Sequence, residues 1–478
     1  MLRKFIYPII FLPFCLYATP HIASVNNAKD ILDKSALKEE KKDILIVDYS
    51  AIENFILQSN LELKSLNNLV SSSAFNISSK LAKRYPTLDL QALGIPKYVA
   101  SKNYNSNSVT TETSQYSINP SINIRWDLID PLRNSEIKIA KNNYEIAKNN
   151  YDIKRKDLVK EAKSRYHKFQ KSYQEIENQK IALSSSLISL DDAQSKFNTG
   201  IGTRFEVLEA EAQLARDKQL LNEKNIQHKI NKISLREILN FKDDFKIKED
   251  QKIIGFWNYK LNKNINNGLA KNLSLKNINL QKSIKQSQAN NFLNANKPNI
   301  YISNIFSSSF TKGDSMAVSR DPSESGSSYT NTISLNFSWN IFNGGKNRNS
   351  FNASKAEAKA EEYSYSNLTN ILRTRINKAF LNLKLNKEKI LSTKKEISST
   401  KESLRLSRLR YEVGISTLKD VLVRQKELSM ANSKNIDAIY SYNLNLDELE
   451  RLTFLKISNI CDEEDNYSTI TLKSICNI

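Results

Sequence analysis

One stretch of this sequence limits the possible folds more than any other. Leu132 to Asn198 contains no glycine or proline, and Ile139, Ile146 and Ile153 follow one another at intervals of seven residues. Sustained heptad spacing favours a helix that packs lengthwise against other helices. At 1.5 Å per residue such a helix would span about 100 Å, several times the length of a helix in a compact domain. The chain is therefore expected to build something long.

The long helix is expected to turn back on itself. The segment Phe197–Thr203 carries Gly200 and Gly202, and a second run without glycine or proline follows from Arg204 to Ile254. The chain of 478 residues has only 10 glycines and 9 prolines, whereas average usage would give about 7% and 5%. A mean hydropathy of −0.51 indicates that the long helices are mostly in contact with water. These features predict a fold dominated by helical hairpins.

The N-terminus indicates export from the cytoplasm. Arg3 and Lys4 precede an apolar stretch, Phe5–Tyr17, and small residues at Ala18 and Ala23 could end a cleavage site. This is the pattern of a signal peptide over residues 1–23, with an apolar part too short to span a bilayer. A retained anchor is the alternative. Lipidation at Cys15 is disfavoured because Leu12-Pro13-Phe14 precedes it. Residues 24–47 are polar, rich in lysine and expected to be a flexible lead-in.

Charge and cysteine content leave few further functions open. The formal charge is +20, but Lys and Arg alternate with Glu, Asp and Asn along the helical runs and no arginine-rich arm stands out, so nucleic acid is not an expected partner. Removal of the signal would leave Cys461 and Cys476, which could form a disulfide or remain two thiols. No histidine lies near them, so a metal site is disfavoured.

A second pattern appears twice along the chain. Ile118–Leu128 alternates apolar and polar residues as a strand with one apolar face does, and Ile333–Ile341 repeats the alternation. Self-similarity at one long period indicates a duplication. We expect a first repeat at 48–240, with strands near 86–102 and 116–130 and a helical hairpin at 132–240. We expect a linker at 241–268, a second repeat at 269–455 (strands near 298–310 and 329–343, hairpin 346–455) and a tail at 456–478.

The four expected strands are too few to close into a membrane barrel within one chain. Alternating strands with apolar outward faces match a lipid-facing sheet, and strands in a membrane must close into a barrel because an open edge leaves backbone groups unpaired. Four strands are too few, since the smallest barrels have about eight. Membrane insertion would therefore require several chains. The alternative is a soluble, secreted coiled coil with a small half-buried sheet, whose strands would alternate in the same way.

Two sequence strings resemble a known family. Trp339-Asn340-Ile341-Phe342-Asn343-Gly344-Gly345 and the turn Arg410–Leu422 are similar to segments of the TolC-like outer-membrane efflux proteins, and Phe197–Leu208 is a looser version of the second string. The resemblance extends from about Asp48 to Phe454. It implies a mainly α fold with a transmembrane β-barrel, in which the duplicated strand–strand–helical hairpin unit recurs.

The resemblance also implies an assembly and a function. Three chains of four strands would form a homotrimer with a 12-stranded barrel in outer-membrane lipid and a helical tunnel in the periplasm, with loops 103–115 and 307–329 outside the cell. Such proteins are passive ducts of tripartite efflux or type I secretion systems for drugs, small molecules or polypeptides. Their partners are a periplasmic adaptor and an inner-membrane pump of ABC, RND or MFS type. The competing interpretation is a secreted coiled-coil structural or adhesive protein.

The resemblance assigns a gate near the two glycine turns. Asp420 and Glu206 match acidic pore positions, where carboxylate rings favour cations, and Tyr411 matches a tyrosine that bridges to the acidic position, here Glu206. Taken alone, these residues read as solvated helix positions. Ser416 and Val423 stand where the best-known member has an arginine and a second aspartate, which predicts fewer closing contacts and less ring charge.

The glycine turns themselves are expected to dock the adaptor. Gly200 and Gly414 admit backbone conformations closed to other residues, and Thr203 and Thr417 can cap the helices that follow. No catalytic motif, cofactor site or metal site is indicated, because the three histidines (His21, His167 and His228) are scattered and no phosphate loop or nucleophile elbow is present. The sequence predicts a channel component and not an enzyme.

Overall fold

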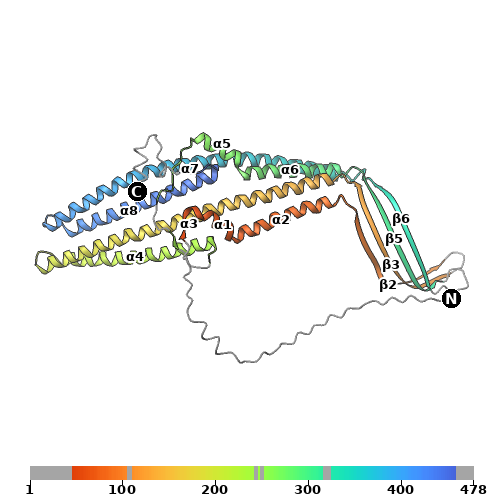
Figure 1. Cartoon of the computed structure of the whole chain (residues 1–478), viewed down its shortest axis with the longest axis horizontal. Coiled ribbons are helices and arrows are strands. Elements are labelled where there is room, and N and C mark those ends of the chain that lie inside the picture. The colour runs from red at the N-terminus through yellow and green to blue at the C-terminus, as the bar shows by residue number, and fades with distance from the viewer. Residues whose placement is uncertain (1–45, 105–109, 242–245, 248–251, 316–324, 459–478) are drawn as a thin grey trace, which may run out of the picture. The chain divides into compact units, whose positions relative to one another are not determined.

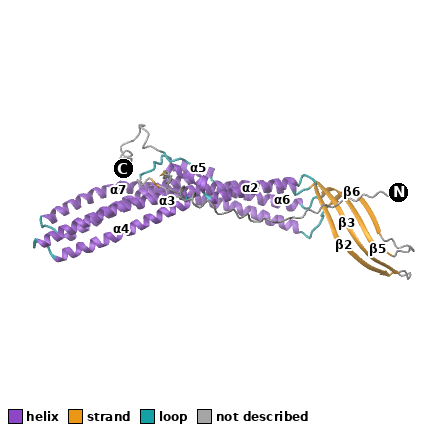
Figure 2. Cartoon of the chain, turned by 60° about the horizontal axis from the view of Figure 1, so that its bottom comes forward, coloured by secondary structure: helices purple, strands orange, loops and turns teal. Residues whose placement is uncertain are grey.

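The computed structural model of the chain describes residues 46–104, 110–241, 246–247, 252–315 and 325–458, which belong to one compact unit. The expected signal peptide, most of the lead-in, and the pair Cys461 and Cys476 lie outside the described residues. Long helices dominate and run to one end, while the strands lie at the other end (Figures 1 and 2). The mainly helical fold with antiparallel strands is confirmed. No described helix is both long enough and apolar enough to cross a bilayer.

The chain consists of two copies of one unit. The first contains α1 (Ile52–Ser59), α2 (Leu61–Ala82), β2 (Thr87–Tyr104), β3 (Thr110–Ile129), α3 (Arg133–Asn198) and α4 (Arg204–Leu239). The second contains α5 (Leu261–Lys271), α6 (Leu273–Asn294), β5 (Asn299–Ser315), β6 (Ser325–Ser338), α7 (Lys346–Glu412) and α8 (Leu418–Thr453). Equivalent helices match in length: α3 has 66 residues and α7 has 67, while α4 and α8 each have 36.

The helix ends repeat as closely as the helix lengths. The Asn60 side chain accepts a hydrogen bond from the Leu63 N–H at 3.1 Å, and the Asn272 side chain accepts one from the Leu275 N–H at 3.1 Å. These caps satisfy amide groups that have no partner inside the helix. At the C-terminal end of each hairpin, Asn240 and Phe454 adopt left-handed backbone conformations that terminate α4 and α8. The same capping chemistry thus sets the helix ends in both copies.

Several boundaries differ from expectation. β3 begins at Thr110, β5 extends to Ser315 and β6 begins at Ser325, so much of the two expected loops is strand. The sequence analysis expected loops there because the segments are polar, but Asn, Ser and Thr side chains do not prevent backbone pairing. β6 ends at Ser338, before the expected 343. In the expected irregular linker, α5 begins at Leu261, and a short strand β4 (Lys246–Ile247) pairs in parallel with β1 (Ile46–Val47).

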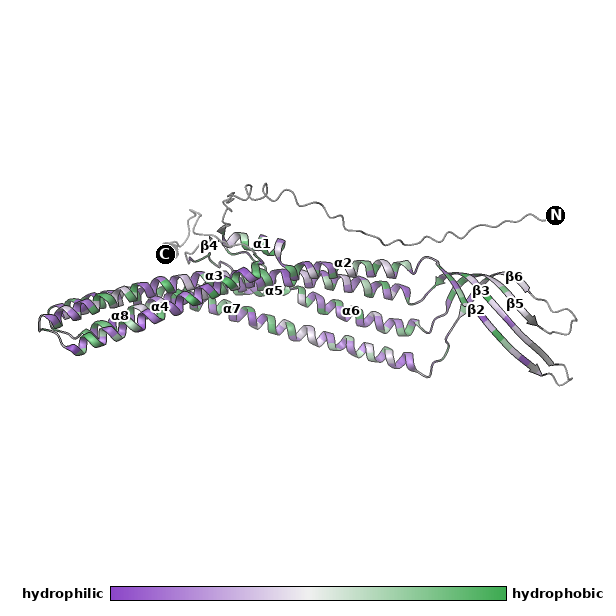
Figure 3. Cartoon of the chain, turned by 90° about the horizontal axis from the view of Figure 1, so that it is seen from below, coloured by the Kyte–Doolittle hydropathy of each residue, from purple (hydrophilic) through white to green (hydrophobic). Residues whose placement is uncertain are grey.

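Packing along the helices is uneven. The heptad isoleucines of α3 are half-buried, and the fully packed part of that helix lies further on, at Leu158, Ala162 and Tyr166. There the segment before α1, including the 3-10 turn η1 (Tyr49–Ala51), closes over α3 and α4 in one apolar cluster. A second cluster joins α7 to α8 and a third lies at the hairpin tips. Figure 3 shows hydrophobic and hydrophilic residues interspersed along the helices between these clusters.

The strands form one antiparallel sheet in the order β2-β3-β5-β6. Its register sets Ile122 opposite Phe306, and Ile302 opposite Leu335. Because side chains alternate along a strand, one face carries apolar residues on all four strands. Exposed members of this apolar face are Leu88, Leu90, Ile122, Ile124, Trp126, Phe306, Ile333, Leu335 and Phe337. β2 and β6 are the two edges, and neither has a partner beyond it within the described chain.

A tryptophan ties the sheet to the helices in each copy. The Trp126 indole Nε1 donates to the Arg84 carbonyl at 3.0 Å, and the Trp339 indole Nε1 donates to the Asn296 carbonyl at 2.7 Å. Each acceptor lies two residues before a proline, in the segment that leads from a helix into a strand. We call these segments the two corners. The repeated bond fixes how each strand pair leaves the helical part.

We predict that Trp339→Phe loosens the second corner. The ring is retained while the Asn296 carbonyl loses its donor, which should lower the free energy of unfolding by about 1 kcal/mol. Hydrogen exchange should accelerate around residues 296–299. Trp257→Phe is the control, since Trp257 Nε1 donates to Asn264 Oδ1 at 3.3 Å, away from both corners. Unchanged exchange at the corner would contradict this role.

Candidate functional site

The two hairpin turns are copies of one turn. Gly200 and Gly414 both have φ of 78°, and a side chain at either position would meet no atom within 4 Å. Ile201 N–H donates to the Lys196 carbonyl at 3.0 Å, and Ile415 N–H donates to the Arg410 carbonyl at 2.8 Å. A left-handed residue after a helix is most readily a glycine. We call these turns the first tip and the second tip; Figure 1 shows them together at the end opposite the sheet.

Both acidic candidates, Glu206 and Asp420, bind backbone amides at the start of a helix. Glu206 Oε2 accepts from Thr203 N–H at 3.3 Å while Thr203 Oγ1 accepts from Glu206 N–H at 3.3 Å. Asp420 Oδ2 accepts from the Thr417 N–H at 3.2 Å and from the Thr417 hydroxyl at 3.0 Å. The Thr417 amide and hydroxyl hold the pKa of Asp420 below its usual range. Each carboxylate thus satisfies an amide group at a helix start; the Thr203 hydroxyl caps α4 as expected, whereas the Thr417 hydroxyl donates to Asp420.

Glu206 also connects the two hairpins. Its second oxygen, Oε1, accepts from the Leu418 N–H at 3.4 Å, the first residue of α8. Leu418 is fully buried, in a cluster with Val207, Leu404 and Tyr411 that contains residues of all four hairpin helices. One side chain of the first hairpin therefore caps helices of both hairpins.

Tyr411 lies near Glu206, but the two do not form the expected bridge. The Tyr411 side chain is 5% exposed, and its hydroxyl has no hydrogen-bond partner in the described chain. Burial raises the pKa of Tyr411 to about 12, with the carboxylates of Glu206 and Asp192 adding to the effect. Lys196 contacts this tyrosine instead: its Nζ lies 3.8 Å from the ring centroid and donates to the Tyr411 carbonyl.

Lys196 was missed by the sequence analysis, for a physical reason. It lies in the last turn of α3, where a cation is ordinarily favourable beside the helix C-terminus. Nothing in the local sequence distinguishes that generic role from a contact with Tyr411, which is 215 residues away. Only the packing of the two hairpins brings the ammonium over the ring.

Asp420 lies in a concavity that also contains arginines. A hollow of about 860 Å³ between α7 and α8 is lined by Asp420, Arg410, Arg424, Ser416 and several further serines. The positive charges of Arg410 and Arg424 also lower the pKa of Asp420, after the Thr417 bonds. Asp420, the carboxylate expected to line the pore, therefore has two arginines as neighbours. Val423 is 43% exposed on the adjoining turn of α8.

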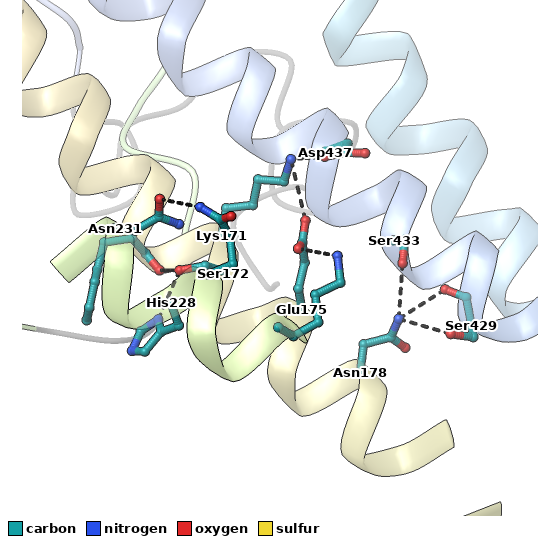
Figure 4. Close-up of polar contacts among 12 residues, drawn as sticks. Lys171, Ser172, Glu175, Asn178, His228, Asn231, Ser429, Ser433 and Asp437 are labelled. Atoms are coloured by element: carbon teal, nitrogen blue, oxygen red, sulfur yellow. Dashed lines mark hydrogen bonds and ion pairs between the residues drawn. The ribbon is translucent and has the colours of Figure 1, made fainter. Parts of the chain in front are cut away.

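A polar seam joins the hairpins above the tips. Asn178 on α3 donates through Nδ2 to the Ser429 carbonyl at 3.0 Å and to the Ser433 hydroxyl at 3.2 Å, both on α8 (Figure 4). Lys171 Nζ pairs with Asp437 Oδ1 at 2.6 Å in the same seam. Each polar contact of this kind is worth little net free energy. The seam therefore consists of many individually weak contacts.

Other ionisable groups have structural roles. His167 is fully buried and contacts Asp447 at 3.1 Å, and Tyr49 donates to the same carboxylate at 2.5 Å. Burial raises the pKa of Tyr49, and the charge of Asp447 raises it further. This cluster fastens the segment before α1 to both hairpins. Across the described ranges, no group of three or more His, Cys, Asp and Glu side chains is placed to hold a metal ion.

Comparison with known proteins assigns the class. Crystal structures of the same fold include the CmeC outer-membrane channel of Campylobacter jejuni, with a TM-score of 0.69 and 16% identity over 96% of this chain and 97% of that one. Another is the outer-membrane protein VceC of Vibrio cholerae, with a TM-score of 0.69 and 13% identity over 85% and 96%. A third is the open state of the MtrE outer-membrane channel of Neisseria gonorrhoeae, at 0.61 and 15% over 85% and 88%.

The family follows from the sequence itself. No curated protein sequence matches the chain, but the model of the outer membrane efflux protein family matches residues 54–240 and 269–453. The fold is that of an outer-membrane channel with a periplasmic helical part. The chain belongs to the outer membrane efflux protein family. This finding favours a channel over the alternative interpretation, a secreted coiled-coil protein.

We predict that Lys196→Met uncouples the tips. Loss of the cation over Tyr411, worth about 0.5–2 kcal/mol, should accelerate hydrogen exchange across residues 411–418 by about threefold to tenfold. Lys196→Arg keeps the cation and should restore protection. Lys218→Met, an exposed lysine on α4 without an ion pair in the described chain, is the matched control. Equal exchange in Lys196→Met and the parent protein would contradict the coupling.

Proposed function

We propose that three copies of the chain assemble into a continuous passive duct of a tripartite export system. The observation that carries this proposal is the open sheet: β2 and β6 are edges of a sheet with one apolar face. In lipid, unpaired backbone groups along both edges are too costly to persist. Pairing β6 of one copy with β2 of the next satisfies both edges, and three copies of four strands give a closed 12-stranded barrel. The number three is the one that the family resemblance implies.

The helical tips are proposed to dock a periplasmic adaptor protein. Large apolar side chains surround both tips: Ile201 is 80% exposed, Phe205 is 72% exposed and Ile415 is 69% exposed. Such a concentration of exposed apolar groups at one end of a molecule favours a protein partner. The adaptor would link the duct to an inner-membrane pump of ABC, RND or MFS type, and the pump would supply the energy and select the cargo. Drugs, small molecules and secreted polypeptides are the candidate cargo classes.

The gate is proposed to be the contact set between the tips. Lys196 on Tyr411 and Glu206 on Leu418 hold the second tip against the first. Adaptor binding would exchange these contacts for contacts with the partner, and the polar seam would permit the hairpins to separate. Asp420 and its arginine neighbours would then line the entrance. A channel of this kind has no catalytic step, which is consistent with the proposal that the chain is not an enzyme.

We predict that a bulky residue at Gly414 stops export without preventing trimer assembly. Gly414 has a positive φ and open space around it, so Gly414→Leu would place a side chain on the proposed docking surface. Gly344 has φ of 65° and equally open space, beside the sheet. Gly344→Leu therefore introduces similar backbone strain away from the adaptor. Drug susceptibility and crosslinking to the adaptor report the outcome; normal export by the Gly414 variant would sink the docking proposal.

We predict opposite effects from neutralising the two signs of charge at the second tip. In planar bilayers at low salt, Asp420→Ala should lower the cation-over-anion permeability ratio by about twofold, and Arg410→Ala should raise it by a similar factor. Both effects should shrink in high salt, where charges are screened. Glu388→Ala, an exposed acidic residue on α7 with no ion pair in the described chain, is the control. If reversal potentials are unchanged in the Asp420 variant, the charge ring lies elsewhere.

A further inference from the structure

The apolar face of the sheet has the height of a membrane. On β3, Tyr116 and Trp126 occupy the same face and are separated by ten residues. At about 3.4 Å per residue and a tilt of about 45°, they are about 24 Å apart along the membrane normal, close to the usual apolar band of about 25 Å. Aromatic pairs mark the far limit: the rings of Tyr98 and Tyr116 are 4.9 Å apart, and those of Phe310 and Tyr329 are 6.1 Å apart.

The near limit of the band coincides with the two corners. Trp126 projects from the apolar face and its indole reaches the Arg84 carbonyl, so that corner lies on the lipid side of the sheet. Trp339 continues the same face beyond β6 and reaches the Asn296 carbonyl, which places the second corner there too. Tryptophan is the residue that most favours a membrane–water boundary. The corners therefore lie at the level of the lipid headgroups.

Basic residues are concentrated at this level. Four segments adjoin the strands at this level: 79–86, 130–140, 290–298 and 343–353. Together they contain eight Lys and Arg residues and two Asp and Glu residues, whereas the whole chain has 71 and 51. We call these eight residues the basic collar: Lys80, Lys83, Arg84, Arg133, Lys138, Lys297, Lys346 and Arg348. An excess of six positive charges per chain is thus confined to about two helical turns next to the membrane band.

Within the described residues, the collar charges are only partly neutralised. Lys80 and Lys83 share a single carboxylate, Glu136, at 3.3 and 2.7 Å. The other exposed members (Arg84, Lys138, Lys297, Lys346 and Arg348) have no acidic partner in the described part of the chain. Lys346 and Arg348 lie in the first turn of α7, which contains no acidic residue. Cations are unfavourable at a helix N-terminus, so helix stability does not explain them.

We propose that the basic collar binds the phosphate-bearing headgroups of anionic phospholipids in the leaflet that faces the helices. The inference rests on the proposed barrel, because it requires the apolar face of the sheet to lie in a bilayer. Exposed aromatic and apolar side chains adjoin the cations, with Tyr85 70% exposed and Phe342 83% exposed. This combination suits a surface that contacts acyl chains and headgroups together. Each cation near an anionic surface strengthens binding by about fivefold.

Fluorescence quenching can measure this lipid preference at the corners directly. The chain has three tryptophans, so a Trp257→Phe background leaves only Trp126 and Trp339 as indole reporters. The assembled protein is reconstituted into phosphatidylcholine bilayers containing either phosphatidylglycerol or phosphatidylcholine brominated near the headgroup. We expect the binding constant for phosphatidylglycerol to exceed that for phosphatidylcholine by at least about threefold. Raising NaCl to about 0.5 M should bring the ratio towards one.

A matched pair of triple variants isolates the collar from general charge. Lys297→Gln/Lys346→Gln/Arg348→Gln should lower the ratio towards one, leaving the part contributed by the cations at the first corner. Lys218→Gln/Lys229→Gln/Lys389→Gln removes the same charge from exposed lysines on α4 and α7 that have no ion pair in the described chain, and should leave the ratio unchanged. A ratio near one in the parent protein overturns the collar while the barrel stands. Failure to insert into either bilayer overturns both the barrel and the collar.

Discussion

The demand that every backbone amide in lipid find a partner governs the rest of this structure. β2 and β6 leave two edges open in a single chain, while the sheet between them is apolar on one face. Such a sheet is incomplete as a membrane element, and in the proposed trimer pairing with further copies would complete it. Each corner is held by a tryptophan hydrogen bond, so closing the sheet in the proposed trimer would also arrange the hairpins around a common axis. The duplication gives every copy the same corner twice.

The two ends of the molecule are built from contacts of different strength. At the sheet end, long backbone ladders and aromatic contacts join β2, β3, β5 and β6. Between the hairpins, an apolar cluster lies at the tips, and above it many contacts are made by polar side chains such as Ser429, Asn178 and Lys171. Backbone ladders break cooperatively, whereas each side-chain contact of this kind contributes little net free energy by itself. The sheet end is thus held by cooperative backbone pairing, while individually weaker polar contacts help to hold the hairpins together.

The sequence predicted features that depend on local chemistry. The long helices followed from the glycine-free run after Leu132, and the tips followed from Gly200 and Gly414. It failed where polar composition was equated with a loop, because Thr110 and Ser325 begin strands whose pairing uses backbone atoms alone. It also failed for contacts made by packing, since Lys196 and Tyr411 are distant in sequence. The tyrosine was identified through a resemblance, yet its partner here is a lysine and its hydroxyl is unpaired.

The contacts proposed to hold the tips are of a size that a docking protein can overcome. The cation over Tyr411 contributes about 0.5–2 kcal/mol, and the bond from Leu418 N–H to the Glu206 carboxylate about 1.5–3 kcal/mol. Each chain would then resist opening by about 2–5 kcal/mol, and three chains by about 6–15 kcal/mol. Moving a two-state equilibrium from one per cent to ninety-nine per cent open takes about 5.5 kcal/mol of differential binding. An adaptor that displaced these contacts at each of the three chains would supply that difference, whereas a cargo molecule touching one tip would not. Opening would therefore depend on the partner, and the closed duct would stay shut against solutes that merely reach it.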